Sequence, residues 1–297
     1  MTTIHRLGLA LLFFVQPSSA GFAQLQTIAA VPPSSDFAVR VAAIEKRTGG
    51  RLGIAALDTA SGRHVTYHAE QRFAMCSTFK FVLVAAVLAR VDAKRESLNR
   101  RVSYGAADLL EYAPVTKAHL PEGSMTVSEL CAAAIEYSDN TAANLLLKLV
   151  GGPKALTRYA RSLGDAMTRL DRFEPDLNSN ATGDVRDTTS PAAMLKTMTS
   201  LLTGNALTAT SRLQLERWMI GATTGAARLR AGLPRDWSVG DKTGTGRNGA
   251  VNDIATARPP NALPVLIVVF LTHSSLAAPE SDAVLAEVGR IIVSDLK

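Results

Sequence analysis

The chain has 297 residues, of which 47% are hydrophobic and 20% are charged, and its formal net charge is +6. This apolar content is enough for a large buried core and excludes an intrinsically disordered protein. Basic residues are dispersed, and Glu96 interrupts the densest stretch, residues 94–101, so the sequence does not indicate nucleic-acid binding.

The first two dozen residues have the pattern of an export signal. Arg6 precedes an apolar run at residues 7–15, which is too short to cross a bilayer, and small residues follow. Cleavage after Ala20 and cleavage after Ala23 both fit, so residues 1–23 are taken as the signal peptide. We expect a secreted, periplasmic protein that has no membrane association once this segment is removed.

Patterns of helix and strand then follow one another along the chain. An amphipathic helix begins at Ser35 or Asp36 and ends before Gly49, and strands are predicted at 52–58 and 64–69. The periodicity is mostly helical from about residue 77 to 218. Strands return at 237–245, 253–258 and 265–272, and a helix at 281–296 closes the chain.

Strand patterns at both ends predict an α/β protein of the α+β type. Its antiparallel sheet is built from both chain ends and flanked by helices, and an all-helical subdomain is inserted between them. We assign residues 24–69 and 219–297 to the α/β subdomain and residues 70–218 to the helical one. A functional site is expected in the cleft between the two.

The strongest chemical signal is at residues 77–80, with the sequence STFK, which open an apolar helix. Positions three apart share a helix face, so the Lys80 amine is expected beside the Ser77 hydroxyl. A helix N-terminus favours an alkoxide and disfavours a nearby ammonium group. A neutral lysine beside a serine is what activation of a nucleophile requires. Taken alone, the same residues also fit a serine cap followed by an incidental lysine.

Residues 138–140, with the sequence SDN, separate two predicted helices. The Ser138 hydroxyl can relay a proton to a leaving nitrogen, and the Asn140 amide can bind a substrate carbonyl. Taken alone, the segment also fits a polar capping loop.

Residues 242–245, with the sequence KTGT, lie at the end of a predicted strand. Lys242 presents a positive charge there, and the hydroxyls of Thr243 and Thr245 are hydrogen-bond donors. Gly244 allows a substrate to lie close against the strand edge. An ordinary strand end is the alternative interpretation.

Together the three segments resemble the signature of serine β-lactamases and penicillin-binding proteins, in the same order and at similar separations. A fourth segment, residues 174–178 with the sequence EPDLN, resembles the Glu-x-x-Leu-Asn segment of class A β-lactamases. A carboxylate and an amide four residues apart can hold a water, whose proton Glu174 takes as it attacks an ester. The resemblance therefore implies catalytic roles for Ser77, Lys80, Ser138, Glu174 and Asn178.

The resemblance covers nearly the whole mature chain and implies further residues around the cleft. Arg172 and Asp187 correspond to the ends of the family's Ω-shaped loop, here residues 172–187, where an ion pair is expected to pin the neck. Tyr112 corresponds to the aromatic residue at the cleft mouth.

Substrate binding is implied for a second group of residues. Arg228 resembles a cleft arginine that supports Lys242 and Thr243 in binding the substrate carboxylate. Backbone N–H groups of Ser77 and Thr245 are implied to hold the oxyanion.

The two cysteines cannot form the bridges found in some family members, because Val84 and Gly246 stand at the partner positions of Cys131 and Cys76. We expect two unpaired, packed thiols, although a bridge between them is open from the sequence alone. The missing Cys at position 246 also weakens the case for a carbapenem-hydrolysing enzyme.

Nucleotide and metal sites are not expected. Residues 244–249 match the pattern G-x-G-x-x-G, but they lead into a predicted strand, whereas the dinucleotide fingerprint opens a helix. The five histidines do not have the spacing of metal ligands. No cofactor is predicted.

The predicted function is hydrolysis of the lactam amide of penicillins and cephalosporins through a Ser77 acyl-enzyme, which water activated by Glu174 deacylates. Such a hydrolase of cyclic amides confers β-lactam resistance, takes small-molecule β-lactams and is expected to be a monomer. The sequence leaves open whether Lys80 or Glu174 starts acylation. The alternatives are a D,D-peptidase of the penicillin-binding type and a non-hydrolytic β-lactam sensor; both usually need membrane attachment and lack the segment at 174–178.

Overall fold

The structure is a computed structural model that describes residue 2 and residues 35–296. The predicted signal peptide lies outside the described residues, apart from residue 2, and its two candidate cleavage sites stay predictions. Within the described part, no helix is both long enough and apolar enough to span a bilayer.

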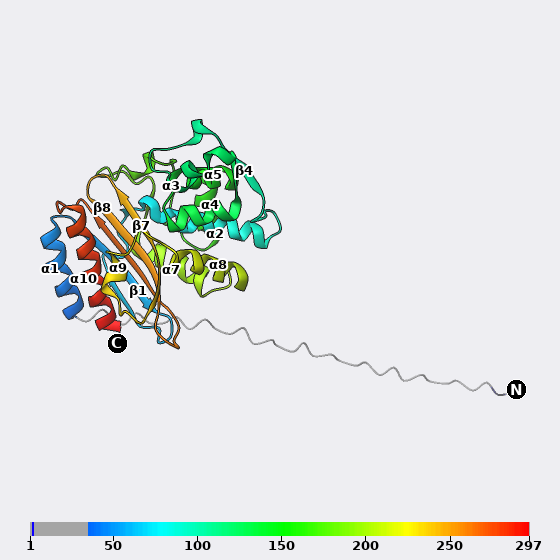
Figure 1. The fold of residues 1–297 in the computed structure, drawn as a ribbon. Helices are drawn as coiled ribbons and strands as arrows, with labels where there is room; N and C mark the ends of the chain where they lie inside the picture. The colour runs from blue at the N-terminus through cyan, green and yellow to red at the C-terminus, as the bar shows by residue number, and fades with distance from the viewer. Residues whose placement is uncertain (1, 3–34, 297) are drawn as a thin grey trace.

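A five-stranded antiparallel sheet, in the order β2-β1-β9-β8-β7, forms the centre of the molecule (Figure 1). Its strands are β1 (Arg51–Asp58), β2 (His64–Tyr67), β7 (Ser238–Gly246), β8 (Ala250–Arg258) and β9 (Val265–Thr272). Along the β1 and β9 pairing, Ile54 lies opposite Val269, so the first and last parts of the chain meet in one sheet. The predicted α+β class with a sheet from both chain ends is confirmed.

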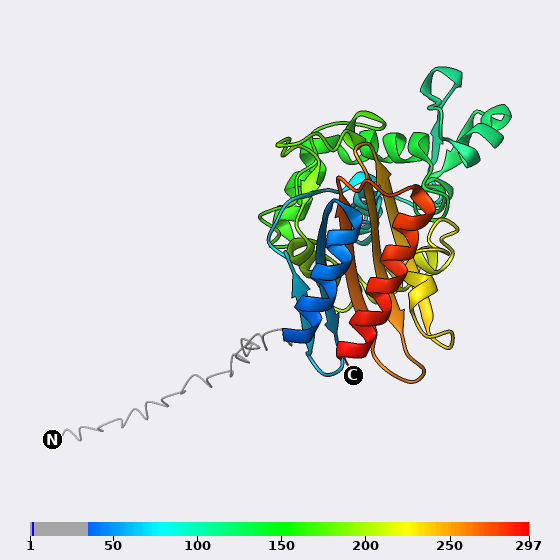
Figure 2. The same ribbon diagram turned by 90° about the vertical axis from the view of Figure 1, so that its left-hand side faces the viewer.

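Two long helices, α1 (Ser35–Thr48) and α10 (Ala278–Leu296), lie side by side across one face of this sheet (Figure 2). Phe37, Val41 and Ile44 recur at helical spacing, so a single stripe of α1 is buried. The short helix α9 (Leu229–Gly232) adds Leu229 to the same core. Each such side chain contributes roughly 1.5–3 kcal/mol by its burial.

The other face of the sheet packs on a larger, mostly helical core. Helix α2 (Phe79–Asp92) runs through it, and all ten residues from Phe79 to Leu88 are buried. Its sequence is therefore apolar all round, as expected for a helix with neighbours on every side. The surrounding helices are α3 (Pro114–Ala118), α4 (Val127–Glu136), α5 (Asn140–Val150), α6 (Pro153–Ser162), α7 (Pro191–Leu202) and α8 (Ala209–Ile220).

Short strands and 3₁₀ turns connect these helices. Strands β3 (Phe73–Ala74) and β6 (Thr188–Thr189) pair with each other, as do β4 (Arg101–Ser103) and β5 (Ser124–Thr126). The turns are η1 (Cys76–Thr78), η2 (Ala106–Asp108), η3 (Leu120–Glu122) and η4 (Asp176–Asn178).

The two largest differences from the predicted boundaries are three residues each, and the other strand ends differ by at most two. Strand β8 begins at Ala250 and not at residue 253, because the buried Asn252 amide donates to the backbone carbonyls of Ala74 and Met75 and so fits the strand interior. Helix α10 begins at Ala278, three residues earlier than predicted, where the Glu280 carboxylate accepts a hydrogen bond from the backbone N–H before the helix.

The predicted subdomain division at residues 70–218 stays a prediction. Met194 and Met198 of α7 belong to that helical segment, yet they share one core with Phe270 of β9. The sheet and the helices are therefore joined by continuous packing. Both cysteines, Cys76 and Cys131, are buried and unpaired, as the sequence predicted.

Candidate active site

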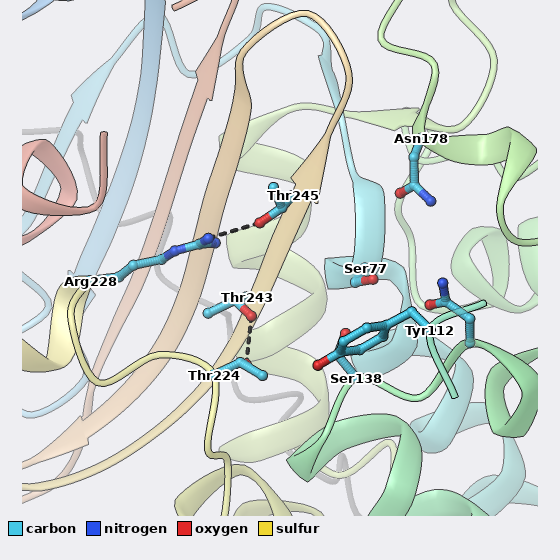
Figure 3. Close-up of a pocket in the computed structure, with 9 residues that line it drawn as sticks. Ser77, Tyr112, Ser138, Asn178, Thr224, Arg228, Thr243 and Thr245 are labelled. Atoms are coloured by element: carbon cyan, nitrogen blue, oxygen red, sulfur yellow. Dashed lines mark hydrogen bonds between the residues drawn. The ribbon is translucent and has the colours of Figure 1, made fainter. Parts of the chain in front are cut away.

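A cavity of about 360 Å³ opens between the helical region and strand β7 (Figure 3). This volume lies within the range of small-molecule sites. The lining consists of eight predicted site residues and Thr224: Ser77, Tyr112, Ser138, Asn140, Asn178, Thr224, Arg228, Thr243 and Thr245. Residues from segments far apart in the sequence thus converge on one small space.

Ser77 lies in the turn η1, directly before α2. The residue before it, Cys76, has a φ of +47°, a left-handed conformation that is uncommon outside glycine. Thr78 closes the turn, since its backbone N–H and its hydroxyl both donate to the Met75 carbonyl, at 3.2 and 2.8 Å. The nucleophile candidate is therefore held by local hydrogen bonds at the start of the helix.

Strands β7 and β8 support this turn from behind. A Cβ atom on Gly244 would lie 2.7 Å from the Met75 carbonyl oxygen, so only glycine allows β7 to pack this closely. Glycine is therefore needed at position 244 for packing, in addition to the predicted role of letting substrate lie close to the strand. The Asn252 amide of β8 donates to the Ala74 and Met75 carbonyls at 2.8 and 3.1 Å, a contact that the sequence did not reveal.

The Lys80 side chain is completely buried beneath Ser77. Its amine donates to the Ser138 carbonyl at 2.7 Å and to Asn140 Oδ1 at 2.6 Å, and it lies 3.1 Å from Glu174 Oε1. The Ser77 hydroxyl approaches the same Glu174 oxygen at 3.4 Å. Serine and lysine therefore meet at one carboxylate oxygen. Burial lowers the pKa of Lys80, while the Glu174 charge opposes that shift.

A second buried lysine, Lys242, approaches from β7 and donates to the Ser138 hydroxyl at 3.0 Å and to the Thr243 carbonyl at 2.9 Å. Burial lowers its pKa to about 7, and the positive charge of Lys80 adds to the shift. The Lys80 amine also lies 3.4 Å from the Ser138 hydroxyl. Ser138 thus stands between two amines, a position suited to moving a proton.

Asp139, a supporting residue that the sequence did not indicate, holds this loop in place. Its buried carboxylate caps α5 by accepting from the Ala142 N–H at 2.8 Å. It also accepts from the backbone N–H groups of Val115 and Thr116, at 3.0 and 2.9 Å. The segment that carries Tyr112 is tied in this way to the loop at residues 138–140, and 51% of the Tyr112 surface stays exposed at the mouth of the cavity.

Glu174 is buried, and both its side chain and its backbone are fixed. Asn178 donates to Glu174 Oε2 at 2.5 Å. The Asn144 side chain makes two hydrogen bonds with the Glu174 backbone, at 2.9 and 3.0 Å. Asn144 lies one helical turn after Asn140, so the same face of α5 supports both sides of the site. This four-residue spacing from Asn140 is the sequence feature that could have indicated Asn144 as a residue of the site.

The neck of the predicted Ω-loop is pinned as the sequence implied. Arg172 Nε lies 2.5 Å from Asp187 Oδ2, and the second Asp187 oxygen accepts from the backbone N–H groups of Asp171 and Arg172, at 2.7 and 2.9 Å. Asp187 is completely buried, so this ion pair is shielded from solvent on one side.

Arg228 directly precedes α9, and its side chain extends to Thr245 of β7 (Figure 3). Its guanidinium donates to the Thr245 hydroxyl at 2.8 Å and to the Gly244 carbonyl at 3.0 Å. It also donates to the Asn252 carbonyl at 2.8 Å and pairs with Asp282 at 2.7 Å. Arg228 therefore reinforces the strand edge as well as facing the cavity.

Thr224 is the lining residue that was not predicted as part of the site. Its hydroxyl lies 2.6 Å from the Thr243 hydroxyl (Figure 3). One of these two hydroxyls must donate to the other, so the contact limits the directions in which the Thr243 hydroxyl can point.

The comparisons with known proteins agree with this geometry. The model of the β-lactamase enzyme family matches residues 36–296. β-Lactamase CTX-M-4 of Salmonella typhimurium is 48% identical over 250 residues, or 84% of this chain and 86% of that protein. β-Lactamase AST-1 of Nocardia asteroides is 49% identical over 257 residues, covering 86% and 83% of the two chains.

The solved structures point the same way. One is the class A β-lactamase of the last common ancestor of Gram-negative bacteria (GNCA4). It matches this chain with a TM-score of 0.87 and 57% sequence identity, over 89% of this chain and 100% of that one. This chain belongs to the class A serine β-lactamases. The β-lactamase hydrolyses β-lactams and so confers resistance to them. Family membership favours the hydrolase over the D,D-peptidase and the sensor.

The described part of this β-lactamase does not contain a group of three or more His, Cys, Asp or Glu side chains that could hold a metal ion. Residues 244–249 form the end of β7 and the turn into β8, so the glycine pattern there does not open a helix.

Proposed function

We propose that this β-lactamase hydrolyses penicillins and cephalosporins through an acyl-enzyme on Ser77. Water that is activated by Glu174 then hydrolyses this acyl-enzyme. One observation carries the proposal: a single buried carboxylate, that of Glu174, approaches Ser77 Oγ at 3.4 Å and Lys80 Nζ at 3.1 Å, and accepts from Asn178 at 2.5 Å. A nucleophile, an amine and a base for water therefore share one space.

In acylation, Ser77 Oγ attacks the lactam carbonyl, and the backbone N–H groups of Ser77 and Thr245 hold the developing oxyanion. The carbonyl C–N bond breaks, and Ser138 passes a proton to the leaving nitrogen. The hydroxyl proton of Ser77 goes to Lys80 or to Glu174. Burial supports a neutral Lys80, and the direct approach to Ser77 supports Glu174.

In deacylation, water attacks the ester carbonyl, and Glu174 takes its proton. Asn178 engages Oε2, which leaves Oε1 directed toward Ser77. Asn178 Oδ1 is buried and accepts no hydrogen bond from any described residue, so it offers a second acceptor for the attacking water. The ion pair between Arg172 and Asp187 closes the neck of the loop that carries both Glu174 and Asn178.

Substrate binding is proposed for the strand side of the cavity. Lys242, Thr243, Thr245 and Arg228 together recognise the carboxylate that penicillins and cephalosporins carry. Because Lys80 engages Asn140 Oδ1, the Asn140 amide nitrogen is the group left to bind a substrate carbonyl. Tyr112 contacts the substrate at the mouth. Gly244 keeps the strand close to the nucleophile.

We also propose that the enzyme is exported to the periplasm as a monomer that needs no cofactor. The export signal pattern at residues 1–23 supports secretion. Fractionation of cells that produce the full chain tests it, and the enzyme should appear in the periplasmic fraction with a mass that corresponds to cleavage after Ala20 or Ala23.

The Glu174→Gln variant tests the proposed mechanism. Glutamine keeps the shape and a hydrogen-bonding group but cannot accept the proton, so deacylation should slow by at least about 10²-fold. Provided that Lys80 supports acylation, an intact-mass spectrum after exposure to a penicillin should show one adduct per chain that persists for minutes or longer. The Ser77→Ala/Glu174→Gln variant, as the matched control, should carry none.

A chromogenic cephalosporin separates the remaining outcomes. Wild-type enzyme should give continuous turnover, and Glu174→Gln should give one stoichiometric burst followed by slow release. Wild-type rates in Glu174→Gln would contradict the role of Glu174, and an adduct in the double variant would contradict the role of Ser77.

A further inference from the structure

A second cavity, of about 340 Å³, lies outside the active site and is lined mainly by cationic side chains. Helix α6 forms one wall, and the segment leading into the Ω-loop forms the other. The lining residues are Arg72, Lys154, Thr157, Arg158, Arg161, Arg169, Leu170 and Asp171. Five of these eight side chains are positively charged and one is negative.

The α6 wall presents three cations on one face. Lys154, Arg158 and Arg161 lie at intervals of four and three residues, which places them in one row along the helix. Like charges at this spacing destabilise a helix by a few tenths of a kcal/mol per pair. Lys154 and Arg158 are exposed and pair with no carboxylate in the described part of the chain.

The arginines deeper in the cavity are bound mostly to neutral groups. Arg72 donates to the Met167 carbonyl and to the Thr188 hydroxyl, both at 2.9 Å. Arg161 donates to the carbonyls of Asp165 and Thr168, both at 2.6 Å. These bonds fix the direction of each guanidinium without pairing it directly with a carboxylate in the described part of the chain.

Asp171 and Asp165 are the two carboxylates that lie beside these arginines, and both are engaged. Asp171 pairs with Arg169 at 2.6 Å and also accepts the Asp187 N–H at 3.1 Å. Asp165 is buried and accepts hydrogen bonds from the backbone at 167 and 168 and from the hydroxyl of Thr197. Among the lining residues the positive charges exceed the negative ones by four, and Asp165, Asp184 and Asp187 offset part of this excess from outside the cavity.

The cations are close enough to influence one another. Burial lowers the pKa of Arg72, and the positive charges of Arg169 and Arg161 lower it further. A hollow that gathers mutually repelling positive charges is stabilised when an anion enters it.

We propose that this cavity binds a small polyvalent anion that carries adjacent phosphate groups. Arginine forks suit phosphate oxygens, and the row on α6 shares with Arg72 and Arg169 a cavity large enough for several linked phosphates. A single small anion would meet only part of this charge. The site is separate from the hydrolytic cleft, and binding there does not depend on the proposed mechanism.

Calorimetric titration with inorganic tripolyphosphate tests the proposal, with sulfate at matched ionic strength as the comparison. Wild-type enzyme should bind about one tripolyphosphate saturably and more tightly than sulfate. The Lys154→Glu/Arg158→Glu variant should bind it at least about tenfold more weakly, because two charge-assisted contacts are replaced by repulsion.

The Lys46→Glu/Arg235→Glu variant is the matched control, since it changes the net charge equally at exposed positions on α1 and before β7. Its affinity should stay within about twofold of wild type. Equal weakening in both variants would mean a general charge effect and would overturn the proposal. An unchanged affinity in the α6 variant would place the ion elsewhere, for example at the active-site cations, and would overturn it too.

Equal affinity for sulfate, or no saturable binding by wild type, would also contradict the proposal. Turnover of a chromogenic cephalosporin provides the folding check, because neither pair of side chains lies in the hydrolytic cavity. All three proteins should hydrolyse it at similar rates.

Discussion

The two walls of the active-site cavity hold their polar groups in different ways. The helical wall carries Ser77, Lys80, Ser138 and Glu174. Its polar groups bond mainly to one another, and the Lys80 amine, for example, contacts both the Ser138 carbonyl and Glu174. On the strand wall, which carries Thr243, Thr245 and Arg228, the arginine donates to strand carbonyls and pairs with Asp282 outside the cavity.

The proposed function assigns the reaction to the helical wall and substrate recognition to the strand wall. A buried, mutually bonded cluster needs little reorganisation when charge moves through it, which is what an acyl transfer requires. A strand edge with hydroxyls and an arginine offers hydrogen-bond donors to an anionic group without taking part in proton transfer. Lys242 belongs to both walls, because it extends from β7 and donates to the Ser138 hydroxyl. Changes to the helical wall should therefore cost more than changes to the strand wall.

The largest effect is expected from Ser77→Ala. Without the nucleophile, hydrolysis of a chromogenic cephalosporin should fall by at least about 10⁴-fold, while the circular dichroism spectrum stays the same. Residual turnover close to the wild-type rate would mean that the helical wall does not supply the nucleophile.

The next effect concerns the loop that positions Glu174. Asp187→Asn removes the charge that pairs with Arg172, so the free energy of unfolding should fall by about 1.5–3 kcal/mol in urea titration. Asp184→Asn is the control, since its oxygen lies 3.4 Å from Arg172 and its loss should matter less. If both variants lose the same stability, the neck pair is not the main support of this loop.

On the strand wall, Arg228→Ala should reduce kcat/KM for a carboxylate-bearing penicillin by about 1–3 kcal/mol in transition-state terms. Arg228 also supports the strand edge, so Asp282→Asn is needed to separate the two roles: it removes the outer partner of the arginine and leaves the cavity side intact. A matching loss in Asp282→Asn would assign the effect to structure and not to substrate binding.

The smallest effect is a pH dependence set by Lys242, whose pKa is lowered to about 7 in the folded protein. Below that pH the amine is charged and attracts the substrate carboxylate, and above it the charge is lost. Because Thr243, Thr245 and Arg228 still bind the carboxylate, the kcat/KM for an anionic penicillin should decline above about pH 7 to a plateau no more than about tenfold lower.

Lys242→Arg sharpens this test, because arginine stays charged throughout the same range. The alkaline decline should weaken or disappear in that variant. An unchanged decline would assign it to another group, such as Lys80.

The reactive residues could be predicted because their chemistry lies in short segments. Ser77 and Lys80 are three residues apart in a helix, and Glu174 and Asn178 are four apart in a loop, so local spacing already brings each pair together. The supporting residues could not be predicted in this way. Asp139 and Asn252 work through backbone groups that are distant in sequence, and such contacts have no local pattern.

The fold was predictable to a similar depth. Period-two and period-3.6 patterns gave the sheet from both chain ends, its flanking helices and the inserted helical segment, because each pattern reports which side of an element is buried. The start of β8 was missed, since Asn252 is a poor strand residue until the nucleophile turn supplies its hydrogen-bond partners.

By itself, the sequence determined the class of the protein, the order of its elements and the side chains that carry the chemistry. Only the tertiary structure decided that Ser77 and Lys80 meet at one oxygen of Glu174, and that Ser138 stands between two buried lysines. It also decided that the three cations of α6 line one cavity together with Arg72 and Arg169. The physical reason is common to all three: burial and charge act through space, and a pKa or a binding pocket depends on neighbours that folding brings together.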